Sequence, residues 1–400
     1  MFRHLFLLIW KRKSRNLMLS LEILIAFVVV FAIAGFAVRS AELYRLPTGF
    51  SIDNVWSVRI KNIERGDSAF APDVAENFKR SLAAVPGVEK VAFASTTPYL
   101  SRTWRSNFAD PVSKRDVLAE MIELDDDALP LLSVTPLQGR LFEQSDNGAP
   151  TDAAIINRRM AQAMFGTAPA LGKIVEHQLG VGGRVQKLRV VGIVDDYRNK
   201  GEFAQPVNII IARVTPGHSD GEMESLLVKV SPGTTRAFEE TLSRQLKLIN
   251  NNWSYEIAPL SVRRADAMKS QITPLIVLSI IAAFLLLMVA FGLFGVLWQN
   301  TTLRIPELGL RRAIGASAGT IYRQIIAEQM LLSTGAMLIG LLLLAQLPIT
   351  GVLGENLNWQ VFAASAALSM AVIYLLSLLC SVYPGWRASR LSPTEALHYE

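Results

Sequence analysis

The chain has 400 residues, of which 51% are hydrophobic and only 18% are charged. Ordinary globular domains carry about 25% charged residues, so this composition argues against an ordinary soluble enzyme. The mean hydropathy is +0.31 and the isoelectric point is about 9.4. A single cysteine, Cys380, excludes an intrachain disulfide and a cysteine-based metal cluster.

Four apolar segments are long enough to cross a membrane. The first, residues 17–38, would form a helix about 33 Å long, and a bilayer core is about 30 Å thick. It is also longer than the apolar part of a signal peptide, which has about 7–15 residues, so we expect a permanent anchor. Transmembrane helices are predicted at 17–38, 273–298, 325–347 and 359–383.

Positive charge gives the expected orientation. Residues 1–16 hold five Lys or Arg and no acid, and the loop 299–324 holds four arginines against one glutamate. The loop 348–358 holds only Glu355. Because basic loops stay in the cytoplasm, we expect both of these basic segments and the tail 384–400 there, with 39–272 and 348–358 outside. The outer segment holds 29 basic and 28 acidic residues, so nothing predicts a nucleic-acid partner.

The segment 39–272 is predicted to fold as an extracytoplasmic domain. Hydrophobic alternation and helical spacing give the order strand, helix, strand near its start and again near its end. Two such units suggest one split β-α-β sandwich, formed by residues of about 50–109 and 220–265. The expected strands are 53–60, 88–95, 224–230 and 253–259, and the expected helices are 72–84 and 234–250.

A second, mixed β/α module is expected as an insertion at about 110–215. Its expected strands are 117–124, 188–194 and 207–214, with a helix at 157–165. The predicted fold class is therefore a membrane protein with four transmembrane α-helices and a large α+β extracytoplasmic domain.

No pattern predicts a catalytic, metal or cofactor site in this chain. Residues 166–173 resemble a phosphate-binding loop, but five residues separate the glycines instead of four, and Ile174 replaces the Ser or Thr that binds magnesium. The four histidines are scattered without metal-ligand spacing. The acids 125–127 lack the glycine and the distal glutamate of a calcium loop, and we expect them to cap a helix through 129–132.

The segment 301–317 predicts a short cytoplasmic helix. Pro306 suits the first turn, where its missing N–H costs nothing. Glu307 suits the positive end of the helix and can pair with Arg311 four residues later. Gly315 can end the helix, and Ser317 can cap the next one.

This helix has an expected apolar stripe made of Leu310, Ala313 and Ile314. The residues alone leave two interpretations open. The segment is either a positive loop that only fixes the topology, or an amphipathic helix that docks on a cytoplasmic partner.

Three segments resemble the FtsX/MacB-like permeases of ABC transporters. The first is ELGLRRAIGAS at 307–317, and the second is the end of the chain, 383–400, with its proline, paired arginines and final Glu-Ala-Leu. The third is AQAMFGTAPALGK at 161–173 followed by LRVVGIV at 188–194, which resembles the MacB-type periplasmic domain and makes the apparent phosphate loop a turn.

This resemblance implies a dimeric, non-enzymatic permease of the bacterial inner membrane, used for efflux of a periplasmic cargo by mechanotransmission. A cytoplasmic ABC ATPase would bind ATP and magnesium, and because the chain begins 16 residues before its first span, we expect the ATPase on a separate chain. The residues expected to couple to it are Glu307, Leu308, Gly309, Arg311, Arg312, Gly315 and Ser317.

The resemblance leaves other assignments open. The partners would be a second permease copy, identical or related, and a periplasmic adaptor of the MacA type with an outer-membrane channel of the TolC type. Alternatives are lipoprotein release, control of a cell-wall hydrolase, or a membrane-anchored sensor without transport.

Smaller features at the ends of the predicted helices carry expectations of their own. Pro384 is expected to end the fourth span, and 392–395 to cap a short surface helix. Ala336 and Gly340 form a small-xxx-small pair that can bring helices close together.

Overall fold

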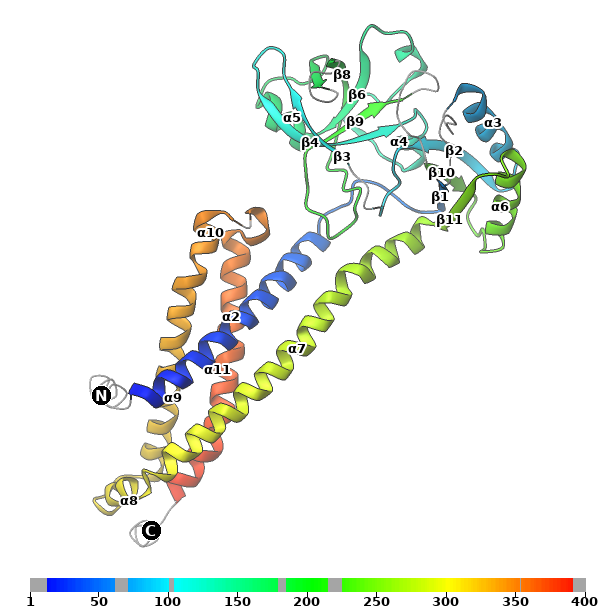
Figure 1. Ribbon diagram of the computed structural model, residues 1–400. Helices are drawn as coiled ribbons and strands as arrows, with labels where there is room; N and C mark the ends of the chain where they lie inside the picture. The colour runs from blue at the N-terminus through cyan, green and yellow to red at the C-terminus, as the bar shows by residue number, and fades with distance from the viewer. Residues whose placement is uncertain are drawn as a thin grey trace. The chain divides into compact units, whose positions relative to one another are not determined.

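The computed structural model describes residues 13–61, 71–100, 104–178, 185–214, 225–352 and 354–390 (Figure 1). The chain forms two compact units. The helical unit comprises Met1–Glu42 and Ile272–Glu400, and the α/β unit comprises Leu43–Gln271. The predicted cap at 392–395 lies outside the described residues.

The helical unit is built on four long apolar helices. All four have the length and composition of membrane spans, as predicted. They are α2 (Lys13–Tyr44), α7 (Leu260–Thr302), α9 (Ala318–Leu344) and α11 (Trp359–Arg390). Shorter helical segments are α8 (Ile305–Ala313), α10 (Gln346–Thr350) and η2 (Gly354–Leu357).

Pro384 does not end the fourth helix, which corrects the sequence-based expectation. Helix α11 continues through it to Arg390, and Pro384 is buried. A proline removes one backbone donor, but apolar helices tolerate it where packing and neighbouring groups compensate. Here the next residue, Gly385, lies against Tyr322 and Ile325 of α9.

Small residues allow the helices of this unit to approach closely. A Cβ added at Gly340 of α9 would lie 2.7 Å from the Phe27 ring of α2. Ala336, one turn earlier, is also buried, as the small-xxx-small pair predicts. The hydroxyls of Ser333 and Ser377 join α9 to α11 at 2.8 Å.

The first module of the α/β unit is a four-stranded antiparallel sheet in the order β11-β1-β10-β2. This is the split β-α-β arrangement predicted from the sequence. The strands are β1 (Val55–Lys61), β2 (Val88–Ala94), β10 (Ser225–Val230) and β11 (Ser254–Pro259). The helices are α3 (Pro72–Ala83) and α6 (Phe238–Ile249).

Alternation along each strand divides the side chains of this sheet between two cores. On β2, Phe93 faces the core beneath α3 and α6, while Ala92 faces the second core. In the first core the Phe78 ring of α3 stacks on Trp253 at 5.9 Å. The two-residue period of a strand therefore explains why both faces of this sheet are buried.

The inserted module is a closed ring of six strands. Its order is β4-β3-β7-β8-β6-β9, and a parallel pairing of β9 with β4 closes it. The strands are β3 (Trp104–Ala109), β4 (Asp116–Leu124), β6 (Asp152–Asn157), β7 (Ile174–Gln178), β8 (Val185–Val194) and β9 (Ile209–Arg213), and β5 (Pro136–Gly139) pairs with β8 outside the ring.

Strands β3, β5, β6 and β7 were not predicted from the sequence. Strand β3 belongs to the ring, so the module begins before residue 110. Strand β6 is buried at five of six positions, which removes the alternation that identifies a half-buried strand. Helix α5 (Arg158–Phe165) was predicted, and the Asn157 side chain caps it by accepting the Met160 N–H.

Residues 166–173 form the connection between α5 and β7. Gly166 and Gly172 both have positive φ angles, of 63° and 77°, which glycine adopts without strain. The Lys173 ammonium lies 4.7 Å from the centre of the Phe165 ring. The segment is thus the turn that the family resemblance implied.

The acids 125–127 lie at the start of a short helix, where the Asp125 side chain accepts the Asp127 N–H at 3.1 Å. Helix α4 (Ala128–Leu131) begins after Asp127, whose backbone is already helical and whose side chain makes no capping bond. Two of the acids also bind bases from elsewhere in the fold. Asp125 pairs with Lys79 at 2.8 Å, and Asp126 pairs with Arg213 at 2.6 Å.

Candidate functional site

Helix α8 is held against the helical unit by one face. Ile305, Leu308 and Gly309, spaced three and four residues apart, are buried. Leu308 packs in a cluster with Ile321 and Ile325 of α9 and Ala388 of α11. This face therefore fixes α8 to two of the long helices.

The opposite face of α8 is open. Leu310 and Ile314 are 59% and 79% exposed, and Glu307 is also exposed. The predicted apolar stripe of Leu310, Ala313 and Ile314 therefore lies on the exposed side of the helix. The burial of Ile305 and Leu308 decides which face turns inward, so the stripe remains on the surface.

A row of polar contacts joins α8 to α9. Arg311 donates to Glu307 at 2.6 Å, as predicted, and to Gln324 of α9 at 2.9 Å. Gln324 in turn donates to Glu328 at 2.9 Å. Arg304, just before α8, pairs with the other Glu328 oxygen at 2.5 Å.

A second contact joins α8 to the end of α11. Arg312 donates to the backbone carbonyl of Ser389 at 3.2 Å. The neighbours Arg311 and Arg312 therefore hold α8 on two different helices. A partly buried hydrogen bond to a charged group, such as that from Arg312 to Ser389, is worth about 1.5–3 kcal/mol. The exposed Glu307–Arg311 pair is worth only about 0.3–0.5 kcal/mol.

The turn after α8 is formed as its residues predict. Gly315 has a φ of 101°, a conformation that side chains with a Cβ rarely adopt. The Ser317 hydroxyl then accepts the Thr320 N–H at 3.2 Å and caps α9.

All seven predicted coupling residues lie on α8 or in the turn that follows it. The sequence did not indicate Gln324, Glu328 or Ser389 as their partners. Glu328 lies 24 residues beyond Arg304, and no local spacing connects the two. Only the packing of α9 beside α8 brings them together.

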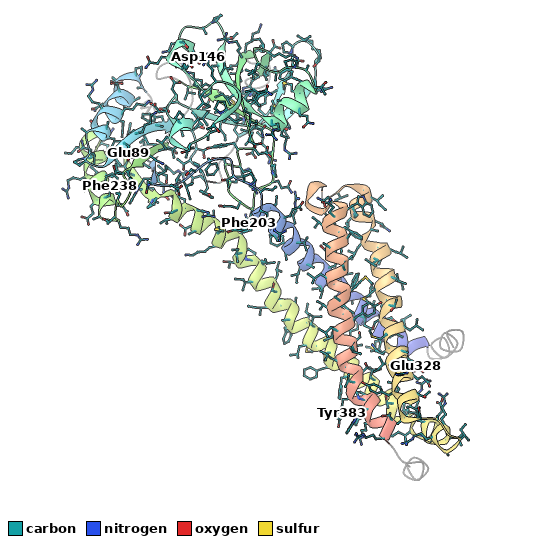
Figure 2. The ribbon with its side chains drawn as sticks, turned by 180° about the vertical axis from the view of Figure 1, so that it is seen from behind. Glu89, Asp146, Phe203, Phe238, Glu328 and Tyr383 are labelled. Atoms are coloured by element: carbon teal, nitrogen blue, oxygen red, sulfur yellow. The ribbon has the colours of Figure 1, made fainter. Side chains whose placement is uncertain are left out.

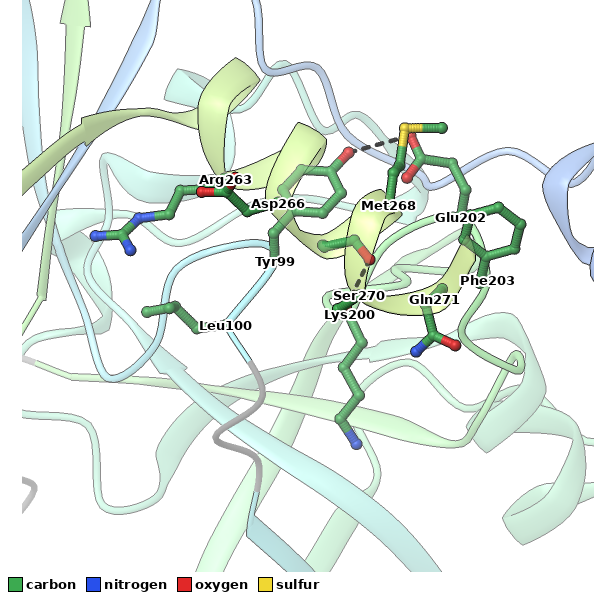
Figure 3. A pocket seen from close by; sticks show the side chains of 11 residues that line it. Tyr99, Leu100, Lys200, Glu202, Phe203, Arg263, Asp266, Met268, Ser270 and Gln271 are labelled. Carbon is green, nitrogen blue, oxygen red and sulfur yellow. Dashed lines mark hydrogen bonds between the residues drawn. The ribbon is translucent and has the colours of Figure 1, made fainter. Parts of the chain in front are cut away.

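The α/β unit contains a second candidate, a pocket of about 300 Å³ (Figure 3). The Tyr99 hydroxyl points to the Glu202 carboxylate at 3.3 Å. Glu202 also accepts from Arg264 at 2.6 Å. Burial, with the Glu202 charge, raises the pKa of Tyr99 far above its ordinary value.

One wall of the pocket is a constrained loop. A Cβ at Gly201 would lie 2.7 Å from the Tyr99 ring, and both residues have positive φ angles. Arg198 is almost fully buried and donates to the carbonyls of Leu46, Glu202 and Ala204. These contacts tie the loop to its neighbours through backbone carbonyls. In the described parts of the chain no group of three or more His, Cys, Asp or Glu could hold a metal.

Comparison with known families matches nearly the whole chain. Residues 17–245 match the MacB-like periplasmic core domain, and residues 279–393 match the FtsX-like permease C-terminal region. The second match contains α8 and its partners on α9 and α11.

Individual relatives are distant. The macrolide export ATP-binding/permease protein MacB of Bdellovibrio bacteriovorus is 26% identical over 66% of this chain and 42% of its own length. The chain thus spans about two fifths of that relative. The uncharacterized ABC transporter permease YknZ of Bacillus subtilis is 23% identical over 90% of this chain and 86% of its own.

Among solved structures, the periplasmic region of MacB from Actinobacillus actinomycetemcomitans matches with a TM-score of 0.40 and 15% identity. It covers 58% of this chain and 98% of that structure. The two family matches, which together cover most of both units, decide the assignment. The chain belongs to the FtsX/MacB-like permeases of ABC transporters.

Proposed function

We propose that this chain is the permease subunit of a bacterial ABC transporter, and that a separate cytoplasmic ATPase docks on α8. The observation that carries the proposal is the division of α8 into two faces. One face is fixed to α9 and α11, and the other exposes Glu307, Leu310 and Ile314.

This division suits the transmission of force. A partner that grips the exposed apolar residues displaces α8, and the Arg304–Glu328 and Arg312–Ser389 contacts carry that displacement to two long helices. An exposed apolar group rimmed by charges is typical of a protein-binding surface. ATP and magnesium would bind in the partner, so this chain needs no nucleotide site of its own.

The proposed orientation places α8 and both termini in the cytoplasm and the α/β unit outside, in the periplasm, across the bacterial inner membrane. The excess of arginine in 299–324 supports it. Movement of the helices would then act on the α/β unit. We further propose a dimer of permeases that exports a periplasmic cargo, with an adaptor and an outer-membrane channel as partners.

Charge reversal on α8 tests the docking surface. Glu307→Arg should reduce co-purification of the ATPase in mild detergent by at least about tenfold, because it breaks the pair with Arg311 and reverses the charge a partner meets. Stimulated ATP hydrolysis should fall in parallel. The double variant Glu307→Arg/Arg311→Glu keeps an intrahelical pair but should still fail to bind.

A matched pair elsewhere provides the control. Glu76 and Arg80 form the same exposed i,i+4 pair on α3, at 3.2 Å, and Glu76→Arg should leave both readouts unchanged. If Glu307→Arg retained a fully stimulated ATPase, docking on α8 would be wrong. A chain that never co-purifies with an ATPase would favour the membrane-anchored sensor. If the function is lipoprotein release or control of a cell-wall hydrolase, the ATPase should still co-purify and be stimulated, but the cargo should differ.

A further inference from the structure

The ends of α7 and α11 in the helical unit carry a continuous stack of aromatic rings. Trp298 of α7 lies parallel to Tyr383 of α11, with 5.8 Å between the ring centres and an angle of 8°. Phe294 stacks on both of these rings, and Trp386 extends the stack beyond Tyr383 at 6.2 Å. Figure 2 shows Tyr383 at the same end of the helical unit as Glu328, the anchor of α8.

Two arginines lie on this stack. The Arg387 guanidinium is 4.4 Å from the centre of the Trp298 ring, and the Arg390 guanidinium is 4.5 Å from Trp386. Both are exposed and lie three residues apart on α11. A ring that covers the flat face of a guanidinium holds it in place but leaves the N–H groups at its edge free to donate.

The positive charges of Arg387 and Arg390 have no carboxylate partner among the described residues. Two acids of the helical unit, Glu307 and Glu328, are already paired with Arg311 and Arg304, and the Glu22 carboxylate lies against Gly292 of α7. Two fixed guanidiniums with free edges match the oxygens of a phosphate, which guanidinium groups bind in a bidentate manner.

The surroundings favour a lipid as the source of that phosphate. Tyr383 and Trp386 are about half exposed, and Leu379 and Val382, next along α11, are also open. This surface continues from the charges into the apolar span, as a phospholipid does from its headgroup into its acyl chains. Trp and Tyr are enriched where a membrane meets water.

We infer that Trp298, Tyr383, Trp386, Arg387 and Arg390 form a binding site for an anionic phospholipid. The two guanidiniums bind the headgroup phosphate, and the rings and α11 support the glycerol and the first acyl segment. This site is independent of the ATPase-docking surface, because it lies on other residues and needs no nucleotide.

Native mass spectrometry of the full chain in mild detergent, titrated with phosphatidylglycerol or phosphatidylcholine, tests the site. Wild type should retain phosphatidylglycerol at least about tenfold more strongly than phosphatidylcholine. Arg387→Gln/Arg390→Gln should abolish this preference. Trp298→Leu/Trp386→Leu should weaken it several-fold although both charges remain, since the guanidiniums lose their support.

The control is Arg323→Gln, at an exposed arginine of α9 in the same end of the helical unit, and it should change nothing. Inorganic phosphate and glycerol phosphate are added as competitors to separate the two sources of phosphate. If either competitor displaces phosphatidylglycerol at a concentration similar to that of the lipid, the site binds a soluble phosphate and the inference is overturned.

The inference is also overturned if Arg387→Gln/Arg390→Gln binds phosphatidylglycerol as strongly as wild type does. It is overturned as well if Arg323→Gln loses as much phosphatidylglycerol binding as that double variant. A third contrary result would be that Arg387→Gln/Arg390→Gln associates less with the ATPase but retains phospholipid as wild type does. If each variant has the same thermal unfolding midpoint as wild type, the loss of phospholipid binding is a local effect and does not come from unfolding. If the glutamine variant does not fold, Arg387→Lys/Arg390→Lys replaces it and should show a partial loss.

Discussion

At the scale of single residues, buried charges show how the α/β unit satisfies its polar groups. The Asp146 side chain is 1% exposed, and Arg140 binds both of its oxygens, at 2.8 and 2.6 Å. The Glu143 N–H donates to the same carboxylate. Hydrogen bonding to Arg140 lowers the pKa of Asp146, because these contacts favour the charged form.

Loss of this arginine should therefore destabilise the α/β unit. Arg140→Gln leaves a buried carboxylate without its main partner, and removing one member of a buried pair costs about 3–5 kcal/mol. Arg140 is partly exposed and Arg189 lies 3.9 Å from Asp146, so we expect about 2–3 kcal/mol. The measurement is urea unfolding of the full chain in detergent, followed by near-ultraviolet circular dichroism.

The same pair gives a pH dependence with a defined sign. An aspartate has an ordinary pKa of about 3.9, and that of folded Asp146 is lower. The stability from the pair is therefore complete above about pH 4 and is lost as the pH falls through the folded pKa. The difference between wild type and Arg140→Gln should shrink toward pH 2. Arg158→Gln, in the exposed pair with Asp195, should change stability by less than about 1 kcal/mol at any pH.

At the scale of elements, two glycines of α9 have opposite roles. A Cβ at Gly340 would approach Phe27 and Leu24 of α2, whereas a Cβ at Gly335 would meet no atom within 4 Å. The first glycine permits helix contact, and the second is on an open surface. The small-xxx-small spacing singles out Gly340, which pairs with Ala336, whereas Gly335 has Leu331 and Ile339 four residues away.

Gly340→Ala and Gly335→Ala test this distinction with the same chemical change. Alanine in place of glycine favours a helix by about 1 kcal/mol, so Gly335→Ala should be neutral or slightly stabilising. Gly340→Ala should destabilise the helical unit by about 1–3 kcal/mol, because Phe27 must move. Thermal unfolding of helical circular dichroism in detergent reports both. Equal effects of the two variants would contradict the assigned contact.

At the scale of the whole molecule, the two units have separate cores. The ring of the α/β unit closes where β9 enters between β4 and β6. Ile211 is fully buried, and its register partners on either side are Ile122 and Ile155. The closure therefore rests on a row of three isoleucines in one core.

Ile211→Ala should open this closure without disturbing the helices. Replacing a buried isoleucine by alanine costs about 2–5 kcal/mol. Limited proteolysis should then cut faster within residues 43–271, while the helical unit keeps its circular dichroism signal. Leu118→Ala, at an exposed position of β4, is the matched control and should leave cleavage unchanged. If Ile211→Ala also removed the circular dichroism signal of the helical unit, the two units would not be independent.

The sequence by itself determined the local elements of this protein. Four apolar runs, two β-α-β units and the capped helix α8 were all predictable, because hydrophobic period, proline and capping residues act within a few positions. The Glu307–Arg311 pair and the Ser317 cap were predictable for the same reason. Of the exposed residues on the proposed docking face, Glu307 was a predicted coupling residue, and Leu310 and Ile314 belonged to the predicted apolar stripe.

Only the tertiary structure decided how distant segments meet. The parallel pairing of β9 with β4, the contact of Arg304 with Glu328 and the outward face of α8 each depend on residues that no local pattern connects. The same holds for α11, which runs through Pro384 and lies against α9 at Gly385. Packing energy is shared among many side chains far apart in the chain, so it settles burial, register and partner choice where local preferences leave several outcomes open.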